Sequence, residues 1–242
     1  MPGYGDDLAH IHDDGFSTLA ELAAPKIVEL LGDRGTSSGL VVELGCGPGR
    51  TARTLTDAGF DVLGLDASPA MIALARRAAP AADFSVASFV EADLLLCQAV
   101  IAVGEVLGYL LDPANTEEAL AEVFARAHAA LEPGGLFVFD LAGPGRVPGS
   151  GPLRSWFEGR DWAVLVETEE DRVAQELTRS ITTFRRDGEL YRRGQEIHRL
   201  RLHRPAEVLA LLRCTGFRAR VRRGYGEEPF APGHRAYFAR KA

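Results

Sequence analysis

The sequence lacks any apolar run near the roughly 20 residues that a helix needs to cross a bilayer. Its first residues, MPGYGDDLAHIHDD, are acidic and lack the basic start and apolar middle of a secretory signal peptide. Cysteine is also scarce: there are three, far apart, at positions 46, 97 and 214. Such spacing excludes a disulfide framework and predicts buried, reduced thiols with no metal site. We therefore expect a cytoplasmic protein with no membrane partner.

Basic residues are rare in the first part of the chain. Residues 1–142 hold 7 of the 27 Lys and Arg but 21 of the 34 Asp and Glu, and the net charge of the whole chain is −7. The basic remainder is compatible with an anionic small substrate, with nucleic acid, or with arginines on the solvent faces of strands. No basic cluster alternates with stacking aromatics, so a nucleic-acid partner is not expected.

The most informative segment, 41–55, reads VVELGCGPGRTARTL. An apolar run ends at Glu43, three glycines follow at alternate positions, and a helical stretch begins at once. A dinucleotide turn would need glycine where Arg50 stands, and an acid before the turn would repel phosphate. A carboxylate there suits an ammonium or sulfonium ligand.

A second apolar run, 60–66, ends in Asp66, which is 21 residues after Gly45. A carboxylate at that place can accept both hydroxyl protons of a ribose. Asp66 or Ser68 could equally cap the helix that follows, because Pro69 suits a first helical position. Both roles can hold together.

With these residues the chain resembles the class I S-adenosylmethionine-dependent methyltransferases, whose first motif is an acid followed by alternating glycines. The resemblance covers residues 40–142 and implies S-adenosylmethionine as cofactor. It places the adenine near Ser88 and Phe89, where many relatives have an acid; Asp93 is the alternative. The cofactor-binding residues that it implies are Glu43, Gly45, Cys46, Gly47, Gly49, Asp66, Ala67, Met71, Ser88, Phe89 and Val103.

Strands alternate with helices through residue 142, which predicts a doubly wound α/β sheet. We expect strands at 41–44, 60–65, 84–89, 99–103 and 136–141. Helices are expected at 16–31, with a break at Pro25, and at 50–58, 69–79 and 116–131, the last ending at a turn over 132–135.

The character changes after a Gly/Pro-rich loop at 143–152. Alternating apolar and polar residues predict antiparallel strands, with a hairpin turn at 186–188. A helix closed by Gly216 and a final pair of strands follow. The expected fold is a Rossmann-like class I methyltransferase sheet, mostly parallel with its last strand antiparallel, carrying an antiparallel β insertion after strand five. We divide it into a cofactor-binding core (1–142), a cap (143–204) and a C-terminal segment that completes the core sheet (205–242).

The acceptor is less well defined by the sequence. No Asn/Asp-Pro-Pro-Tyr motif follows the fourth strand, which favours a small-molecule acceptor, methylated on nitrogen or oxygen by in-line displacement, over a DNA base or protein amide. Glu105, at the ligand edge after that strand, is the first candidate for a general base, or else a helix N-terminal acid. His198 is the second, or else a surface histidine. An anionic acceptor fits the basic half of the chain.

Other interpretations stay open. The same fold could methylate RNA or a protein side chain, or could bind the cofactor as a non-catalytic partner subunit; an NAD dehydrogenase is disfavoured by Glu43 and Arg50. The protein could be a monomer or a homodimer. Around Tyr4, His10 and His12 the sequence resembles the family's N-terminal lid; a disordered or simply docked segment is the alternative. We expect Trp156 and Trp162 to pack within the cap, with an acceptor-binding wall as the alternative.

Overall fold

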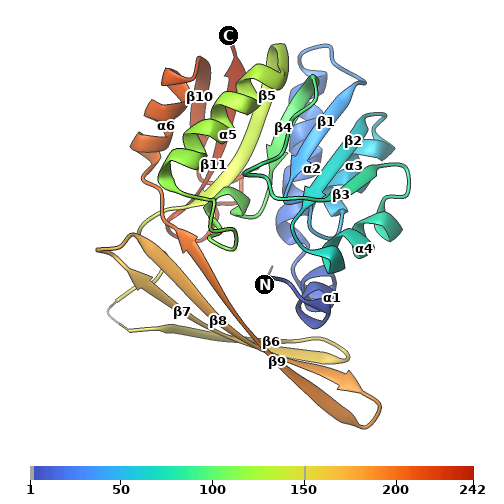
Figure 1. The fold of residues 1–242 in the computed structure, drawn as a ribbon, viewed down its shortest axis with the longest axis vertical. Helices are drawn as coiled ribbons and strands as arrows, with labels where there is room; N and C mark the ends of the chain where they lie inside the picture. The colour runs from blue at the N-terminus through green and yellow to red at the C-terminus, as the bar shows by residue number, and fades with distance from the viewer. Residues whose placement is uncertain (1–2, 150) are drawn as a thin grey trace.

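The structure, a computed structural model, describes residues 3–149 and 151–242 and contains two β-sheets (Figure 1). Three residues lie outside the described part of the chain: Met1 and Pro2, in the expected core, and Ser150, in the expected loop at the start of the cap. The larger sheet has seven strands in the order β10-β11-β5-β4-β1-β2-β3. Its strands are β1 (Leu40–Leu44), β2 (Asp61–Asp66), β3 (Asp83–Val86), β4 (Cys97–Ala102), β5 (Leu131–Ala142), β10 (Phe217–Arg222) and β11 (His234–Lys241).

Only β11 runs against its neighbours in this sheet. Strands β1 to β5 pair in parallel, whereas β11 pairs antiparallel with both β5 and β10. The order in which strands are added to the sheet reverses between β1 and β4, so the carboxyl ends of these two parallel strands open into a crevice where open α/β sheets bind ligands. The predicted fold class is confirmed.

Two sets of helices cover the two faces of this sheet. Successive strand residues point to opposite faces, and Val41 and Val42 accordingly belong to different apolar clusters. Val41 packs with α2 (Thr18–Gly32), α3 (Arg50–Asp57) and α4 (Pro69–Ala78). Val42 packs with α5 (Glu117–Ala130) and α6 (Pro205–Cys214). None of the helices in the described residues is of a length and apolarity that would let it cross a bilayer.

Several element boundaries differ from the sequence expectation. Helix α2 continues through Pro25 without the expected break. Helix α5 ends at Ala130, and β5 begins at once, so the expected turn at 132–135 lies within the strand. The pairing of β4 with β5 shifts its register between Cys97 and Ala99, which accommodates these four residues within β5. Cys214 is exposed, which corrects the expectation that all three thiols are buried.

The second sheet is an antiparallel cap of four strands in the order β6-β7-β8-β9. Its strands are β6 (Leu153–Glu158), β7 (Trp162–Asp171), β8 (Glu176–Asp187) and β9 (Leu190–Arg201). The expected hairpin turn joins β8 to β9, where Gly188 adopts φ +63°. In Figure 1 the cap lies below the carboxyl edge of the large sheet, so one of its faces looks toward the crevice.

Helix α1 (Asp6–Gly15) lies between the core and the cap (Figure 1). The indole Nε1 of Trp162 donates to Asp14 at 2.7 Å, and Leu8 and Ile11 pack with this buried ring. On the core side, Arg50 forms an ion pair with Asp13. Trp156 is 66% exposed and does not share this role, contrary to the sequence expectation.

The glycines of the β1–α3 turn share a left-handed backbone, but two of them, Gly47 and Gly49, have different surroundings. Gly45, Gly47 and Gly49 all have positive φ, of +64°, +52° and +82°. A Cβ on Gly49 would lie 2.8 Å from the Cα of Ala75 in α4, whereas a Cβ on Gly47 would have no atom within 4 Å. Gly49 therefore lets two helices approach, and Gly47 leaves the backbone open to a ligand.

We expect Gly49→Ala to lower the free energy of unfolding by about 2–4 kcal/mol, because it combines left-handed strain with overpacking. Gly47→Ala, the matched control with strain alone, should cost about 1–2 kcal/mol. Urea unfolding of the ligand-free variants measures both values. Equal losses would contradict the packing role of Gly49.

Candidate cofactor and acceptor site

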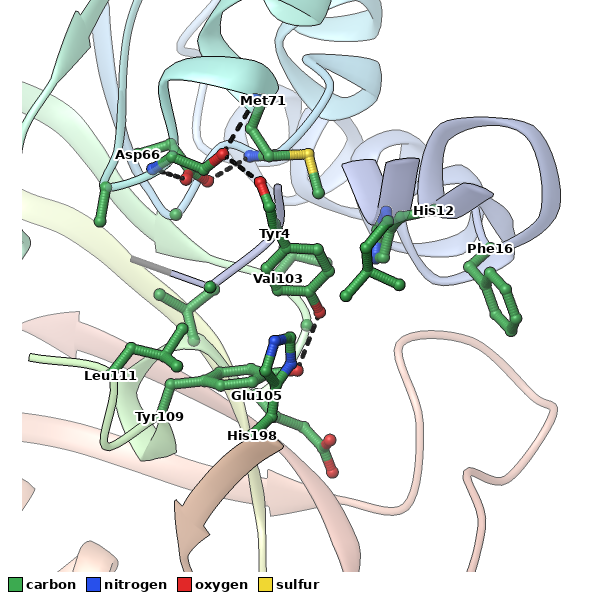
Figure 2. A pocket seen from close by; sticks show the side chains of 18 of the residues that line it. Tyr4, His12, Phe16, Asp66, Met71, Val103, Glu105, Tyr109, Leu111 and His198 are labelled. Atoms are coloured by element: carbon green, nitrogen blue, oxygen red, sulfur yellow. Dashed lines mark hydrogen bonds between the residues drawn. The ribbon is translucent and has the colours of Figure 1, made fainter. Parts of the chain in front are cut away.

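A cavity of about 770 Å³ lies where the carboxyl ends of the core strands, helix α1 and the cap meet. Figure 2 shows Tyr4 near its centre, between Asp66 on the core side and Tyr109 and His198 on the other. All the cofactor-binding residues predicted from the sequence line this cavity except Gly49, which packs against α4. Both predicted catalytic residues, Glu105 and His198, line it too.

Glu43 occupies the end of β1 with a carboxyl group that is almost completely buried. Burial raises its pKa to about 8, although Thr51 donates a hydrogen bond to it. Its Oε2 has no hydrogen-bond partner among the described residues. A buried, unsatisfied carboxyl oxygen at the edge of a cavity is costly. A cationic ligand group would satisfy it.

Asp66 ends the neighbouring strand β2. Its two carboxylate oxygens accept hydrogen bonds from the backbone N–H groups of Gly47 at 2.9 Å and Ser68 at 2.8 Å. Burial raises its pKa, and these two bonds act against that shift. The Ser68 hydroxyl caps α4 by accepting from Met71 N–H, so the capping role belongs to Ser68. Each Asp66 oxygen keeps a lone pair for a ligand hydroxyl.

Ser88 and Phe89 line the cavity beyond β3, as expected. The Ser88 hydroxyl donates to the carboxylate of Asp112, which lines the cavity as well. Asp93, the alternative acid, is exposed and lies outside the cavity lining. Asp112 was not predicted from the sequence; an acid followed by Pro113 in the loop after β4 was the available signal.

Glu105 follows β4 in a left-handed conformation, φ +61°, which is unusual for a residue with a side chain. Its Oε2 accepts from Arg179 of β8 at 2.6 Å, and its Oε1 lies 3.1 Å from a guanidinium nitrogen of Arg146. Burial would raise the pKa of Glu105, but the two guanidinium charges outweigh it and lower the pKa to about 2. Neither arginine was predicted, because nothing local to them in sequence marks burial.

Asp140 of β5 holds the backbone that carries Glu105. One of its oxygens accepts from Gly104 N–H, the other from Glu105 N–H, both at 2.8 Å. Tyr225 and His234 donate to the same carboxylate at 2.5 and 2.6 Å. With all four bonds made, this fully buried carboxylate fixes the strained loop at the edge of the cavity.

His198 of β9 is 1% exposed, so it is not the surface histidine of the alternative interpretation. Its Nε2 lies 2.9 Å from Glu196, whose carboxylate also accepts from Tyr4 N–H and Gly5 N–H. These bonds lower the pKa of Glu196 against the effect of burial. A neutral His198 therefore has its proton on Nε2, where it donates to the Glu196 carboxylate. Nδ1 then keeps a lone pair, and it has no hydrogen-bond partner among the described residues.

The N-terminal segment connects the two halves of the cavity. The Tyr4 hydroxyl lies 3.0 Å from the Tyr109 hydroxyl, and the Tyr4 carbonyl accepts from Ser68 at 2.7 Å. His12 lines the cavity beside Tyr4, and burial lowers its pKa to about 4. His10 instead faces Asp161 of the cap.

The cap supplies the remaining wall, which is mainly apolar. Val164, Val166 and Ile181 project into the cavity beside Phe157, with the hydroxyl groups of Ser155 and Thr168 among them. No group of three or more His, Cys, Asp or Glu suited to a metal ion occurs in the described parts of the chain.

Comparisons with known proteins agree with this arrangement. Residues 41–135 match the family described as a methyltransferase domain. The candidate methyltransferase YqeM of Bacillus subtilis is 24% identical over 250 aligned positions, which cover 97% of this chain and 92% of YqeM.

Two solved structures share the fold over nearly their full length. The CcbJ methyltransferase of Streptomyces caelestis superimposes with a TM-score of 0.81 at 24% identity, covering 100% of this chain and 98% of CcbJ. CalS10, an amino pentose methyltransferase of Micromonospora echinaspora solved with S-adenosylmethionine, gives 0.76 at 20% identity, covering 99% and 98%. The match over residues 41–135 relates this part of the chain to methyltransferase domains, and the chain as a whole has the fold of these two solved methyltransferases.

Proposed function

We propose that the protein transfers the methyl group of S-adenosylmethionine to a nitrogen or oxygen atom of a small molecule by in-line displacement. The observation that carries this proposal is one cavity with two chemically different halves. The core strands supply Glu43 and Asp66 on one side, and the cap supplies an apolar wall and His198 on the other. Tyr4 lies between them (Figure 2).

The residues at the core end fit the cofactor. The unsatisfied oxygen of Glu43 suits its ammonium group, the open backbone at Gly47 allows close approach, and Asp66 can accept from two ribose hydroxyls. Ala67, Met71 and Phe89 offer apolar contacts for the adenine, and Ser88 a hydrogen bond. When bound, the cofactor supplies an electrophilic methyl group, so the chain has to align the acceptor and exclude water.

The enclosure of the acceptor half favours a small molecule over a polymer. Helix α1 and the cap cover the cavity, and the bonds of Glu196 to Tyr4 and Gly5 keep the N-terminal segment across it. Among proteins of the same fold, CalS10 is an amino pentose methyltransferase. An amine is therefore the first acceptor to test, with a hydroxyl compound as the second.

Of the two candidate catalytic residues, His198 has the better chemistry for a base. The Nδ1 lone pair, with Nε2–H directed at Glu196, can take a proton from an ammonium or hydroxyl acceptor. Glu105, with a pKa of about 2, is a weak base; we propose that it orients the acceptor through Arg146 and Arg179.

The first test is transfer of labelled methyl groups from S-adenosylmethionine to a panel of small amines and hydroxyl compounds. We expect wild-type protein to methylate at least one class. Asp66→Ala should lose transfer because its cofactor affinity falls by about 10- to 100-fold, as expected for loss of charged hydrogen bonds. Calorimetry measures that affinity, and Asp61→Ala, an exposed acid at the start of β2, is the control. Unchanged affinity in Asp66→Ala would reject the ribose assignment.

The raised pKa of Glu43 predicts how stability depends on pH without cofactor. The pKa rises from an ordinary value of 4.5 to about 8, so the folded state holds this proton more tightly than the unfolded state. The stabilisation of the folded state by this proton is complete below the pKa of the unfolded state, and it disappears as the pH rises to about 8. Glu43→Gln should remove this loss and be the more stable protein above that pH. Parallel urea curves across the range would show whether the loss belongs to Glu43; identical curves would contradict it.

Glu105→Gln and His198→Gln should separate the two catalytic assignments. In Glu105→Gln we expect lower turnover with cofactor affinity nearly intact, because the residue lies with the acceptor half. In His198→Gln turnover should fall about 100-fold or more, and its pH profile should lose the limb due to the base. Steady-state kinetics and calorimetry measure these effects. Equal loss of turnover and cofactor affinity would assign either residue to structure or cofactor binding.

A further inference from the structure

The acceptor half of the cavity contains two partly buried guanidinium groups around one buried carboxylate. The side chains of Arg146, in the loop after β5, and Arg179, in β8, are 15% and 18% exposed, and that of Glu105 is 7% exposed. Arg179 reaches Glu105 Oε2 at 2.6 Å and Arg146 lies 3.1 Å from Oε1. Each carboxylate oxygen therefore serves one arginine.

This cluster has one positive charge in excess. Within the described parts of the chain, no other carboxylate forms an ion pair with Arg146 or Arg179. The neighbouring acids lie against histidines instead: Asp140 against His234 at 2.6 Å and Glu196 against His198 at 2.9 Å. Removing an unbalanced charge from water is costly. An anionic ligand would remove that cost.

The same arginines have donors left for such a ligand. A guanidinium carries five N–H donors. Besides Glu105, Arg146 donates to the carbonyl of Pro232 at 3.4 Å, and Arg179 donates to the hydroxyl of Tyr109 at 3.3 Å. Both side chains line the cavity, so their free N–H groups are within reach of a bound molecule.

The size of the excess selects the kind of anion. One carboxylate neutralises one charge, and its planar pair of oxygens matches the fork of a guanidinium. A phosphate dianion would leave the cluster negative by a similar amount. The adjoining wall of Val164, Val166 and Ile181 suits an apolar body.

We propose that the acceptor carries a carboxylate, bound by Arg146 and Arg179 beside Glu105, on an apolar body that lies against the cap. This inference rests on the proposed function, since it concerns the acceptor of that reaction. It defines the substrate class as small carboxylic acids with a nitrogen or oxygen nucleophile.

The test is calorimetric binding of matched probes to protein saturated with S-adenosylhomocysteine. Phenylacetate is compared with phenylacetamide, hippurate with hippuramide, and phenyl phosphate provides the phosphate arm. We expect each carboxylate to bind about 10- to 100-fold more tightly than its amide, the range for hydrogen bonds to charged groups. Equal binding within both pairs, tighter binding of phenyl phosphate, or no binding of either carboxylate at millimolar concentration would overturn the proposal.

Arg146→Gln is the decisive variant, because it leaves Glu105 and Arg179 as a neutral pair and removes the excess charge. We expect it to abolish the preference for carboxylates while the affinity for S-adenosylhomocysteine, which also reports folding, stays unchanged. Arg146→Lys should retain part of the preference. Arg154→Gln, an exposed arginine of β6 paired with Glu167, is the control and should bind as wild type does. A preference that survives Arg146→Gln would overturn the assignment.

The outcomes separate this proposal from the proposed function. Methyl transfer to neutral acceptors without any carboxylate preference would overturn the anion site and leave the methyl transfer standing. A carboxylate preference without methyl transfer to any carboxylate-bearing amine or alcohol would support the anion site and overturn the proposed reaction.

Discussion

The ion pair between Glu105 and Arg179 joins the two sheets of this protein at one buried point. Glu105 leaves the core sheet after β4, Arg179 extends from the middle of the cap, and their charged atoms meet at 2.6 Å. Such a pair is worth its desolvation only when its geometry is exact and its remaining atoms are satisfied. Arg146 lies 3.1 Å from the other oxygen of Glu105, and Asp140 holds the backbone of Glu105 in place. Together with the backbone hydrogen bond from Leu110 N–H to the carbonyl of Arg199, this contact holds the cap over the crevice and so shapes the cavity.

Two buried glutamates in one cavity have opposite pKa shifts because their surroundings differ in charge. Glu43, with no cation beside it, has a pKa of about 8, and Glu105, between two arginines, has a pKa of about 2. Glu43 has no positively charged partner among the described residues, whereas the single negative charge of Glu105 lies between two arginines. A sulfonium amino acid and a carboxylate-bearing acceptor would complete the two environments in complementary ways.

The sequence predicts the part of the cavity at the core strands better than the part at the cap, for a physical reason. Glu43, the glycine turn and Asp66 lie within one strand–turn–helix–strand unit, so their spacing along the chain determines their geometry. Arg179 and Glu105 are 74 positions apart, and the alternating pattern of β8 gives no sign that this arginine faces inward.

The same limit applies to smaller features. Gly49 belongs to the motif, but it contacts α4 rather than the cavity, which only the packing of two helices reveals. Asp140 reads as the polar end of a strand, yet it holds the loop of Glu105. Element boundaries near Pro25 and at 132–135 shifted because tertiary packing and a β-bulge override local turn signals.

The N-terminal segment makes the two ligand environments interdependent. Ser68, next to Asp66, donates to the carbonyl of Tyr4, and Glu196, beside the candidate base, accepts from its N–H. A ligand that displaces or tightens Tyr4 from one side thereby changes the free energy of binding on the other. Linkage requires this coupling to be reciprocal: whatever factor the donor adds to the affinity for the acceptor, the acceptor adds to the affinity for the donor. The strength of that coupling would then depend on the two backbone hydrogen bonds of Tyr4.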